Sequence, residues 1–228
     1  SGWATTEELR EGLKKFRESG KFVIAWSDYV LMQEGYYLSA AADKIFVNPS
    51  STIDFKGLSG EVLFYKKALE KLGVEVQVIR HGKFKGAVEP YILDELSDEN
   101  RVQIKTYGGP IWSHVVNNIS ADRGIAVEKL NSITDKLTAY VAQGALDEGL
   151  VDGLLYHDQL IDTLKIRSGL TTDDKITLVP MHKYTNVPET KKHTYQRDKI
   201  SVVYASGSIV NGRGNETNIG GDSFRDVI

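Results

Sequence analysis

Apolar residues along the chain follow two patterns, a helical spacing of about 3.6 residues and short, nearly continuous apolar runs. Residues 7–18 place Leu9, Leu13 and Phe16 on one helical face, and Gly20 follows as a helix-ending glycine. The apolar run 21–26 that comes next predicts a buried, parallel strand. A helix, a glycine and a buried strand in this order are typical of an α/β protein.

The same patterns predict the remaining elements. Strands are expected at 45–47, at 52–58, where the strand passes into a turn, and at 74–80, 176–180 and 200–210. Helices are expected from about residue 33, over 63–72 and 87–96, from a Ser97 cap to about 119, over 126–130 and 136–146, and from an Asp158 cap to 167. Pro110 follows two glycines and predicts a kink or break in the helix that contains it. Gly149 followed by Leu150 predicts a Schellman-type helix end.

The composition changes between residues 170 and 198, where Thr, Asp and Lys dominate and two prolines occur. Segment 170–198 is therefore expected to be a linker between a domain of residues 1–169 and a second domain that starts at 199. At 221–228 a helix begins and the sequence stops before another strand follows, which is an unfinished unit. The chain is expected to be truncated at both ends.

The overall composition narrows the class of protein. The 228 residues include 41% hydrophobic and 26% charged residues, with a formal net charge of -3, which is ordinary for a soluble globular protein and gives no nucleic-acid footprint. Since there is no cysteine, disulfides and thiolate metal sites are excluded. The five histidines are scattered without metal or triad spacing. No apolar run approaches the roughly 18 residues that a bilayer-spanning helix needs.

The candidate for catalytic chemistry is Lys85, which lies between Gly82 and Gly86 in a turn from the expected strand 74–80 to the expected helix start at 87. The positive end of a helix disfavours an ammonium group, and desolvation lowers the lysine pKa further. Moving that pKa from about 10.4 to about 7 costs roughly 4–5 kcal/mol, which an enzyme can supply and a surface loop cannot. Lys85 is therefore a candidate general base.

Two other interpretations of the same segment stay open. Most lysines in such turns are solvated surface charges, since lysine is almost never fully buried. Glu89, four residues further on, could pair with Lys85 and keep it charged. Lys83 is expected to be a surface charge.

Three segments carry a family resemblance. They are 35–45 (Gly-Tyr-Tyr-Leu-Ser-Ala-Ala-Ala-Asp-Lys-Ile), 82–90 (Gly-Lys-Phe-Lys-Gly-Ala-Val-Glu-Pro), and 201–222, which opens with Ser-Val-Val-Tyr-Ala-Ser-Gly and ends in Gly-Gly-Asp. Together they resemble the signal peptide peptidase A family, also called protease IV, of the crotonase and Clp-protease superfamily. The resemblance implies an α/β fold of repeated β-β-α units. It makes residues 1–169 most of a first, lysine-bearing repeat and 199–228 the start of a second, serine-bearing one.

The resemblance also implies the chemistry. Long members of the family combine a lysine from the first repeat with a serine from the second, and Lys85 matches that lysine. A serine hydroxyl needs an adjacent base, and a lysine can serve without histidine. The position equivalent to the serine is Gln33 here, which cannot be a nucleophile. The nucleophile is therefore expected beyond Ile228, and this chain alone is expected to be inactive. Backbone N–H groups of a glycine-rich turn would stabilise the oxyanion, and no segment is assigned to that turn.

By the same resemblance, the full-length protein is a serine peptidase that degrades released signal peptides. It is expected in the bacterial cell envelope, at the inner membrane facing the periplasm, held by an anchor that this chain lacks, while this chain itself is soluble. A homo-oligomer is implied, with no cofactor, no metal and no nucleic acid. Two alternatives remain: a catalytically silent assembly module of the same fold, and a crotonase-type acyl-CoA enzyme, for which no motif is found.

Overall fold

The computed structural model of the chain describes residues 2–185, 187, 202–215 and 217–226. It forms two compact units, Ser1–Ile176 and Thr177–Ile228, each described by itself. The first unit contains α1 (Trp3–Glu18), β1 (Ile24–Ser27), β2 (Val30–Met32), α2 (Gln33–Ser39), β3 (Lys44–Val47), β4 (Thr52–Asp54), α3 (Lys66–Lys71), the 3-10 helix η1 (Gly86–Val88), α4 (Glu89–Ile92), α5 (Asp98–Arg123), α6 (Val127–Lys136), α7 (Ala142–Asp147), β5 (Gly153–Leu154) and α8 (His157–Arg167). The second contains α9 (Met181–Tyr184), β6 (Ser208–Val210), β7 (Asn218–Gly220) and α10 (Gly221–Arg225).

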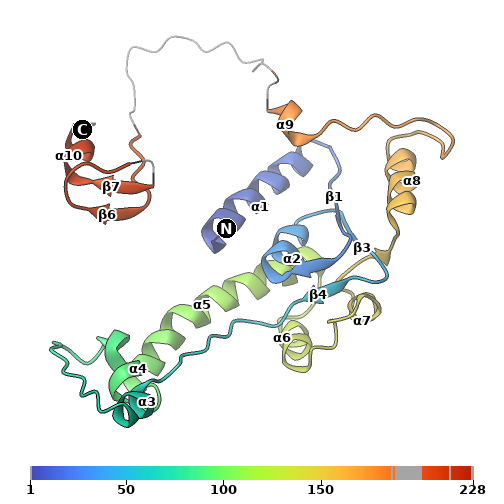
Figure 1. Ribbon diagram of the computed structural model, residues 1–228. Helices are drawn as coiled ribbons and strands as arrows, with labels where there is room; N and C mark the ends of the chain where they lie inside the picture. Colours follow the sequence, from blue (N-terminus) through green and yellow to red (C-terminus); the bar gives the residue numbers. More distant parts are fainter. Residues whose placement is uncertain (1, 186, 188–201, 216, 227–228) are drawn as a thin grey trace. The chain divides into compact units, whose positions relative to one another are not determined.

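Parallel strands form the sheets of both units. In the first, β3 lies between β1 and β5, and β2 pairs with β4. In the second, β6 pairs with β7. The order β-β-α occurs in β1, β2 and α2 and again in β3, β4 and α3. The strands with their covering helices confirm the predicted α/β class (Figure 1). The assignment of residues 1–169, 170–198 and 199–228 to a first repeat, a linker and a second repeat stays a prediction, and residues 188–201 lie outside the described part.

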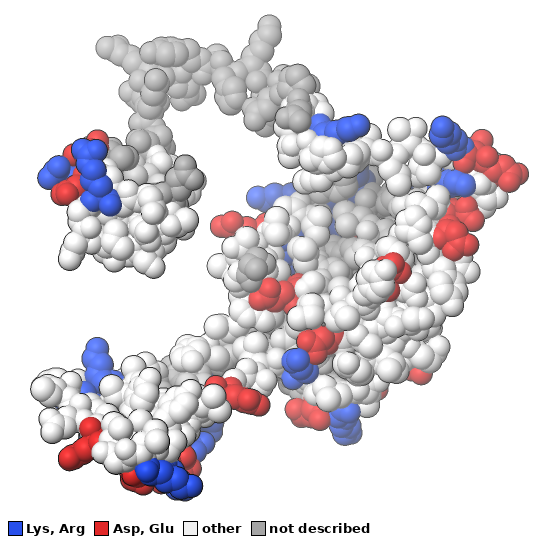
Figure 2. Space-filling view, in the orientation of Figure 1, with Lys and Arg blue, Asp and Glu red and all other residues white. Residues whose placement is uncertain are grey.

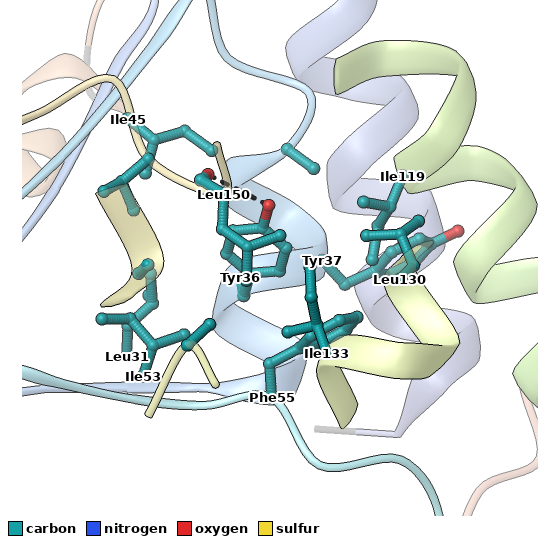
Figure 3. Close-up of a cluster of buried hydrophobic side chains, with 14 of the residues drawn as sticks. Leu31, Tyr36, Tyr37, Ile45, Ile53, Phe55, Ile119, Leu130, Ile133 and Leu150 are labelled. Carbon is teal, nitrogen blue, oxygen red and sulfur yellow. Dashed lines mark hydrogen bonds between the residues drawn. The ribbon is translucent and has the colours of Figure 1, made fainter. Parts of the chain in front are cut away.

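The core of the first unit surrounds α2, whose Tyr36 and Tyr37 are 0% and 1% exposed. Figure 3 shows their rings among apolar side chains from β2, β3, β4, α5, α6 and the turn after α7; its labelled residues are Leu31, Tyr36, Tyr37, Ile45, Ile53, Phe55, Ile119, Leu130, Ile133 and Leu150. The hydroxyl of Tyr36 donates to the carbonyl of Leu150 at 3.0 Å, so its polar end has a partner inside the core. Burial raises the pKa of Tyr36 above its ordinary value, so the ring stays neutral.

Several local predictions are confirmed because local chemistry decides them. α1 ends before Gly20, which has φ +83°. The side chain of Ser97 caps α5 by accepting from the N–H of Asn100. After α7, the N–H of Gly149 donates to the carbonyl of Leu146 and that of Leu150 to the carbonyl of Ala145, which is the Schellman pattern. Strand 45–47 and the helix start at residue 33 are also confirmed.

Other predictions are wrong in extent or in kind. Segments 74–80 and 176–180 are not strands, and 136–146 is helical only at its first residue and from residue 142 on. Residues 202–207 precede β6 without belonging to a strand. The expected helices 63–72 and 87–96 shrink to α3 and to η1 with α4. α5 continues through Pro110, so the expected break is absent, while the alternative of a kink stays a prediction. α8 begins after Tyr156, whose N–H donates to the side chain of Gln159, so Asp158 is not its cap.

Replacing the core hydroxyl tests its contribution. Tyr36→Phe keeps the ring and removes the donor to the buried Leu150 carbonyl, so the free energy of unfolding should fall by about 1–2 kcal/mol. Denaturant unfolding of the full-length protein measures this. Tyr91→Phe is the control, because Tyr91 is 47% exposed, and its effect should stay within about 0.5 kcal/mol. Equal effects of the two substitutions would contradict the assignment.

Candidate active site

In Figure 1, α3 and α4 lie at the end of α5 that is remote from the sheet. Lys85 belongs to the segment between α3 and α4. It is the residue that precedes η1, and its N–H donates to the carbonyl of Gly82 at 3.4 Å. Gly82 has φ +94°, a conformation that glycine adopts without strain. Arg80 donates to the carbonyl of Lys85 at 3.4 Å. The predicted turn with glycines on both sides of Lys85 is therefore present.

The segment 74–80 before this turn has no regular secondary structure and no strand partner among the described residues. Val76 and Val78 are half-buried while Gln77 and Ile79 are exposed, so the alternation that predicted a strand is visible in burial from residue 76 to 79. Val74, the first residue of the pattern, is exposed. A strand also needs a neighbour to satisfy its N–H and C=O groups, and an alternating sequence cannot supply one.

Glu89 organises this region. It is 0% exposed, and its carboxylate accepts from the N–H of Ser97 at 3.1 Å, from the hydroxyl of Ser97 at 2.5 Å and from the side chain of Asn100 at 3.0 Å. Arg80 approaches it at 3.9 Å. Burial alone would raise the pKa of Glu89, but the hydrogen bonds from Ser97 and Asn100, with the charge of Arg80, hold this pKa below its ordinary value. The carboxylate thus ties the two sides of the Lys85 turn to the start of α5.

Glycine at position 86 follows from this packing. A Cβ at Gly86 would lie 2.5 Å from the side-chain nitrogen of Asn100, which is the same amide that holds Glu89. A pocket of about 460 Å³ adjoins the turn and is lined in part by Phe84, Gly86 and Asn100. Any larger residue at position 86 would displace the Asn100 amide and loosen the turn.

The side chain of Lys85 is exposed in this structure. Within the described ranges, no carboxylate oxygen lies within the 4.0 Å of an ion pair with its ammonium, and Glu89 is instead engaged by Ser97, Asn100 and Arg80. The expected alternative of a Lys85–Glu89 pair is therefore wrong. Lys83 is a surface charge as predicted, with its side chain 82% exposed and 4.0 Å from Glu99. The role of Lys85 as a base stays a prediction.

Gln33, at the position expected to be equivalent to the nucleophile, begins α2. Its side-chain oxygen accepts from the N–H groups of Gly57 and Lys56 at 2.7 and 3.0 Å, and its side-chain nitrogen donates to the carbonyl of Gly57 at 2.9 Å. Sequence reasoning missed this contact and the role of Glu89. Neither has a periodic signal, because the partners are 23 to 24 residues apart for Gln33 and 8 to 11 for Glu89.

The structure has the α/β class that the sequence predicted, with parallel sheets and a buried helix that carries two tyrosines. The turn with Lys85 lies in the same unit. Residues 15–171 match the profile of Peptidase family S49, and the chain belongs to this family. This confirms the resemblance to signal peptide peptidase A and the crotonase and Clp-protease type of fold.

Curated relatives match over almost the whole chain. It is 31% identical to Protease 4 of Haemophilus influenzae over 95% of this chain and 36% of that protein. It is 32% identical to Protease 4 of Salmonella typhi over 96% of this chain and 36% of that protein. It is 31% identical to the chloroplastic serine protease SPPA of Arabidopsis thaliana over 91% of this chain and 31% of that protein. The chain thus spans about a third of the length of these relatives.

The buried carboxylate gives a pH-dependent prediction. Because the pKa of Glu89 is lowered on folding, its stabilisation is complete above the ordinary value of 4.5 and is lost as the pH falls through the lowered value. Glu89→Gln should remove this dependence and lower the local stability of residues 80–100 at neutral pH by about 2–3 kcal/mol. Hydrogen exchange of this segment as a function of pH measures both effects.

The matched control is Glu99→Gln, whose parent side chain is 39% exposed and 4.0 Å from Lys83. Its effect should stay within about 0.5 kcal/mol, as for other surface pairs. If the pH profiles of the two variants coincided, Glu89 would not be the residue that holds the turn.

Proposed function

We propose that this chain supplies Lys85 as the general base of a serine–lysine peptidase whose serine lies beyond Ile228 in the full-length protein. The observation that carries the proposal is that Glu89 and Lys85, four residues apart, have different surroundings. Glu89 is buried and fully engaged in holding the turn, while the amine of Lys85 has no carboxylate partner among the described residues. A lysine without a counter-ion loses its proton more readily than a paired one.

In the proposed reaction, the serine hydroxyl passes its proton to the Lys85 amine as its oxygen attacks the peptide carbonyl. The lysine then protonates the departing amine. Water later attacks the acyl group while the lysine takes its proton, and the lysine returns that proton to the departing serine oxygen. The lysine must be neutral to begin this cycle. Since it is exposed in this structure, we propose that a further part of the full-length protein covers it and removes its water.

Substrate, location and assembly are part of the same proposal. One relative, 30% identical over 60% of this chain, is named a putative signal peptide peptidase SppA of Enterococcus faecium. We propose released signal peptides as substrates, a homo-oligomer as the working form, and a place at the bacterial inner membrane facing the periplasm. In the described part of the chain, no helix combines the length and apolarity that crossing a bilayer demands. Figure 2 shows Lys and Arg interspersed with Asp and Glu on the visible face of the first unit, so that face carries no single-sign field of the kind that attracts a nucleic acid.

A catalytically silent assembly module is the second candidate, and one observation favours it. Lys85 is exposed, so its amine lacks in this structure the desolvation that a general base needs. The two candidates differ in the basicity of Lys85 in the full-length protein. An amine-reactivity titration that gives a pKa near neutrality supports the peptidase, and one near the ordinary value of about 10.4 supports the module.

Removing the amine tests the peptidase directly. Lys85→Ala in the full-length protein should lower kcat/KM for an internally quenched peptide at least about 100-fold, the usual contribution of a general base. The thermal midpoint should not fall, because within the described ranges the Lys85 side chain has no ion-pair partner whose loss would destabilise the fold. Lys83→Ala is the matched control two residues away and should retain activity. Peptide turnover that survives in Lys85→Ala would defeat the assignment.

A further inference from the structure

The turn after β4 is held by one side chain, and the way it is held resembles the binding of a ligand. The side-chain oxygen of Gln33 accepts two backbone hydrogen bonds, 2.7 Å from the nitrogen of Gly57 and 3.0 Å from that of Lys56. Its nitrogen donates to the carbonyl of Gly57 at 2.9 Å. The backbone of Lys56 and Gly57 therefore hydrogen-bonds to both the oxygen and the nitrogen of the Gln33 carboxamide.

The donor geometry is that of a site for a carbonyl oxygen. Two N–H groups converge on one oxygen within the range of about 2.7–3.1 Å that oxyanion-binding sites use. Gly57 has φ +85°, a backbone conformation that L side chains rarely adopt, and this conformation directs its N–H together with that of Lys56. Neither donor belongs to a helix terminus, since both come from the turn after β4.

The turn also borders open space. Lys56 and Gly57 line a pocket of about 880 Å³, whose other walls include Trp112 of α5 and Asn131 of α6. Gln33 is not among the pocket's lining residues, but it is only half-buried, so a small ligand can approach the two donors from solvent once the Gln33 side chain is removed.

We propose that the turn at Lys56–Gly57 is a binding site for a carboxamide or peptide carbonyl, and that the chain's own Gln33 occupies it as an internal ligand. The site is closed in this chain because the tethered amide is always present at high effective concentration. Removing the tethered group opens it to amides of the same chemistry. The proposal rests on the Gln33 contacts alone and does not depend on Lys85.

Gln33→Ala with acetamide tests the proposal, because the substitution removes a CH2–CO–NH2 group whose heavy atoms acetamide replaces. Hydrogen exchange of the peptide that contains Lys56 and Gly57 is measured by mass spectrometry in the full-length protein. Exchange should rise about tenfold in Gln33→Ala, which corresponds to about 1.4 kcal/mol of lost hydrogen bonding. Acetamide should restore protection in a saturable manner in Gln33→Ala and have no effect on the unchanged protein.

Two further variants keep the result interpretable. Gln33→Met fills the same volume without hydrogen-bonding groups, so exchange should rise and acetamide should not restore protection. Gln143→Ala removes an exposed glutamine that donates to Asp147, and exchange at Lys56 and Gly57 should not change. Unchanged exchange in Gln33→Ala, absence of restoration by acetamide, or equal restoration in Gln33→Met would each overturn the proposal.

Discussion

The burial of α2 with its two adjacent tyrosines is the constraint on which the first unit depends. Consecutive helical residues point in different directions, so Tyr36 and Tyr37 reach different neighbours. Tyr36 binds the Leu150 carbonyl, while the hydroxyl of Tyr37 accepts from Asn118 of α5 at 2.6 Å and donates to Glu7 of α1. Burial raises the pKa of Tyr37 to about 12, so it remains a neutral donor. Two rings thereby connect α1, α2, α5 and the turn after α7.

The guanidinium of Arg10 completes this connection from α1. It is 0% exposed, lies 4.6 Å from the centre of the Tyr37 ring, donates to the Tyr37 carbonyl at 2.9 Å and pairs with Asp122 of α5. A buried charge is tolerated only when partners replace its water. These contacts engage both terminal nitrogens of the guanidinium, while Nε has no hydrogen-bond partner among the described residues. The direction of α5 relative to the core is therefore fixed by both apolar and charged contacts.

The direction of α5 also sets the position of the turn that contains Lys85, because α5 has 26 residues and extends roughly 39 Å. Its buried residues, Val115, Val116 and Ile119, lie in its second half, whereas Ser97 and Asn100 hold Glu89 at its first turn.

The sequence predicted what local chemistry decides and missed what distant partners decide. The Ser97 cap, the Gly149 helix end and the strand at 45–47 follow from residues within a few positions of each other. The strand expected at 74–80 fails because the alternation of its valines describes side-chain burial and says nothing about a neighbour. Lys85 could be selected from its glycine-flanked turn, but Glu89 was weighed only as its ion-pair partner, since the fold of α5 decides which groups reach that carboxylate. Gln33 could be excluded as a nucleophile, yet its grip on Gly57 depends on the packing of α2 beside β4.

The contacts of Glu89 and Gln33 fix the shape of two turns of this chain. They do not by themselves make Lys85 a general base. A direct Glu89–Lys85 pair would stabilise the ammonium and oppose general-base chemistry. This pair is absent from the structure. The Glu89 carboxylate accepts hydrogen bonds from Ser97 and Asn100 at 2.5 to 3.1 Å, and the cation that approaches it is Arg80 and not Lys85. The turn does not exclude water from the lysine. Desolvation has to supply the larger effect, since lowering a lysine pKa to about 7 costs roughly 4–5 kcal/mol. Because the lysine is exposed here, the proposed role as a base requires that this contribution come from another part of the full-length protein. The described part of the chain places Lys85 without a carboxylate partner beside the first turn of α5, and the geometry of the turn is set by Glu89 and not by the lysine itself.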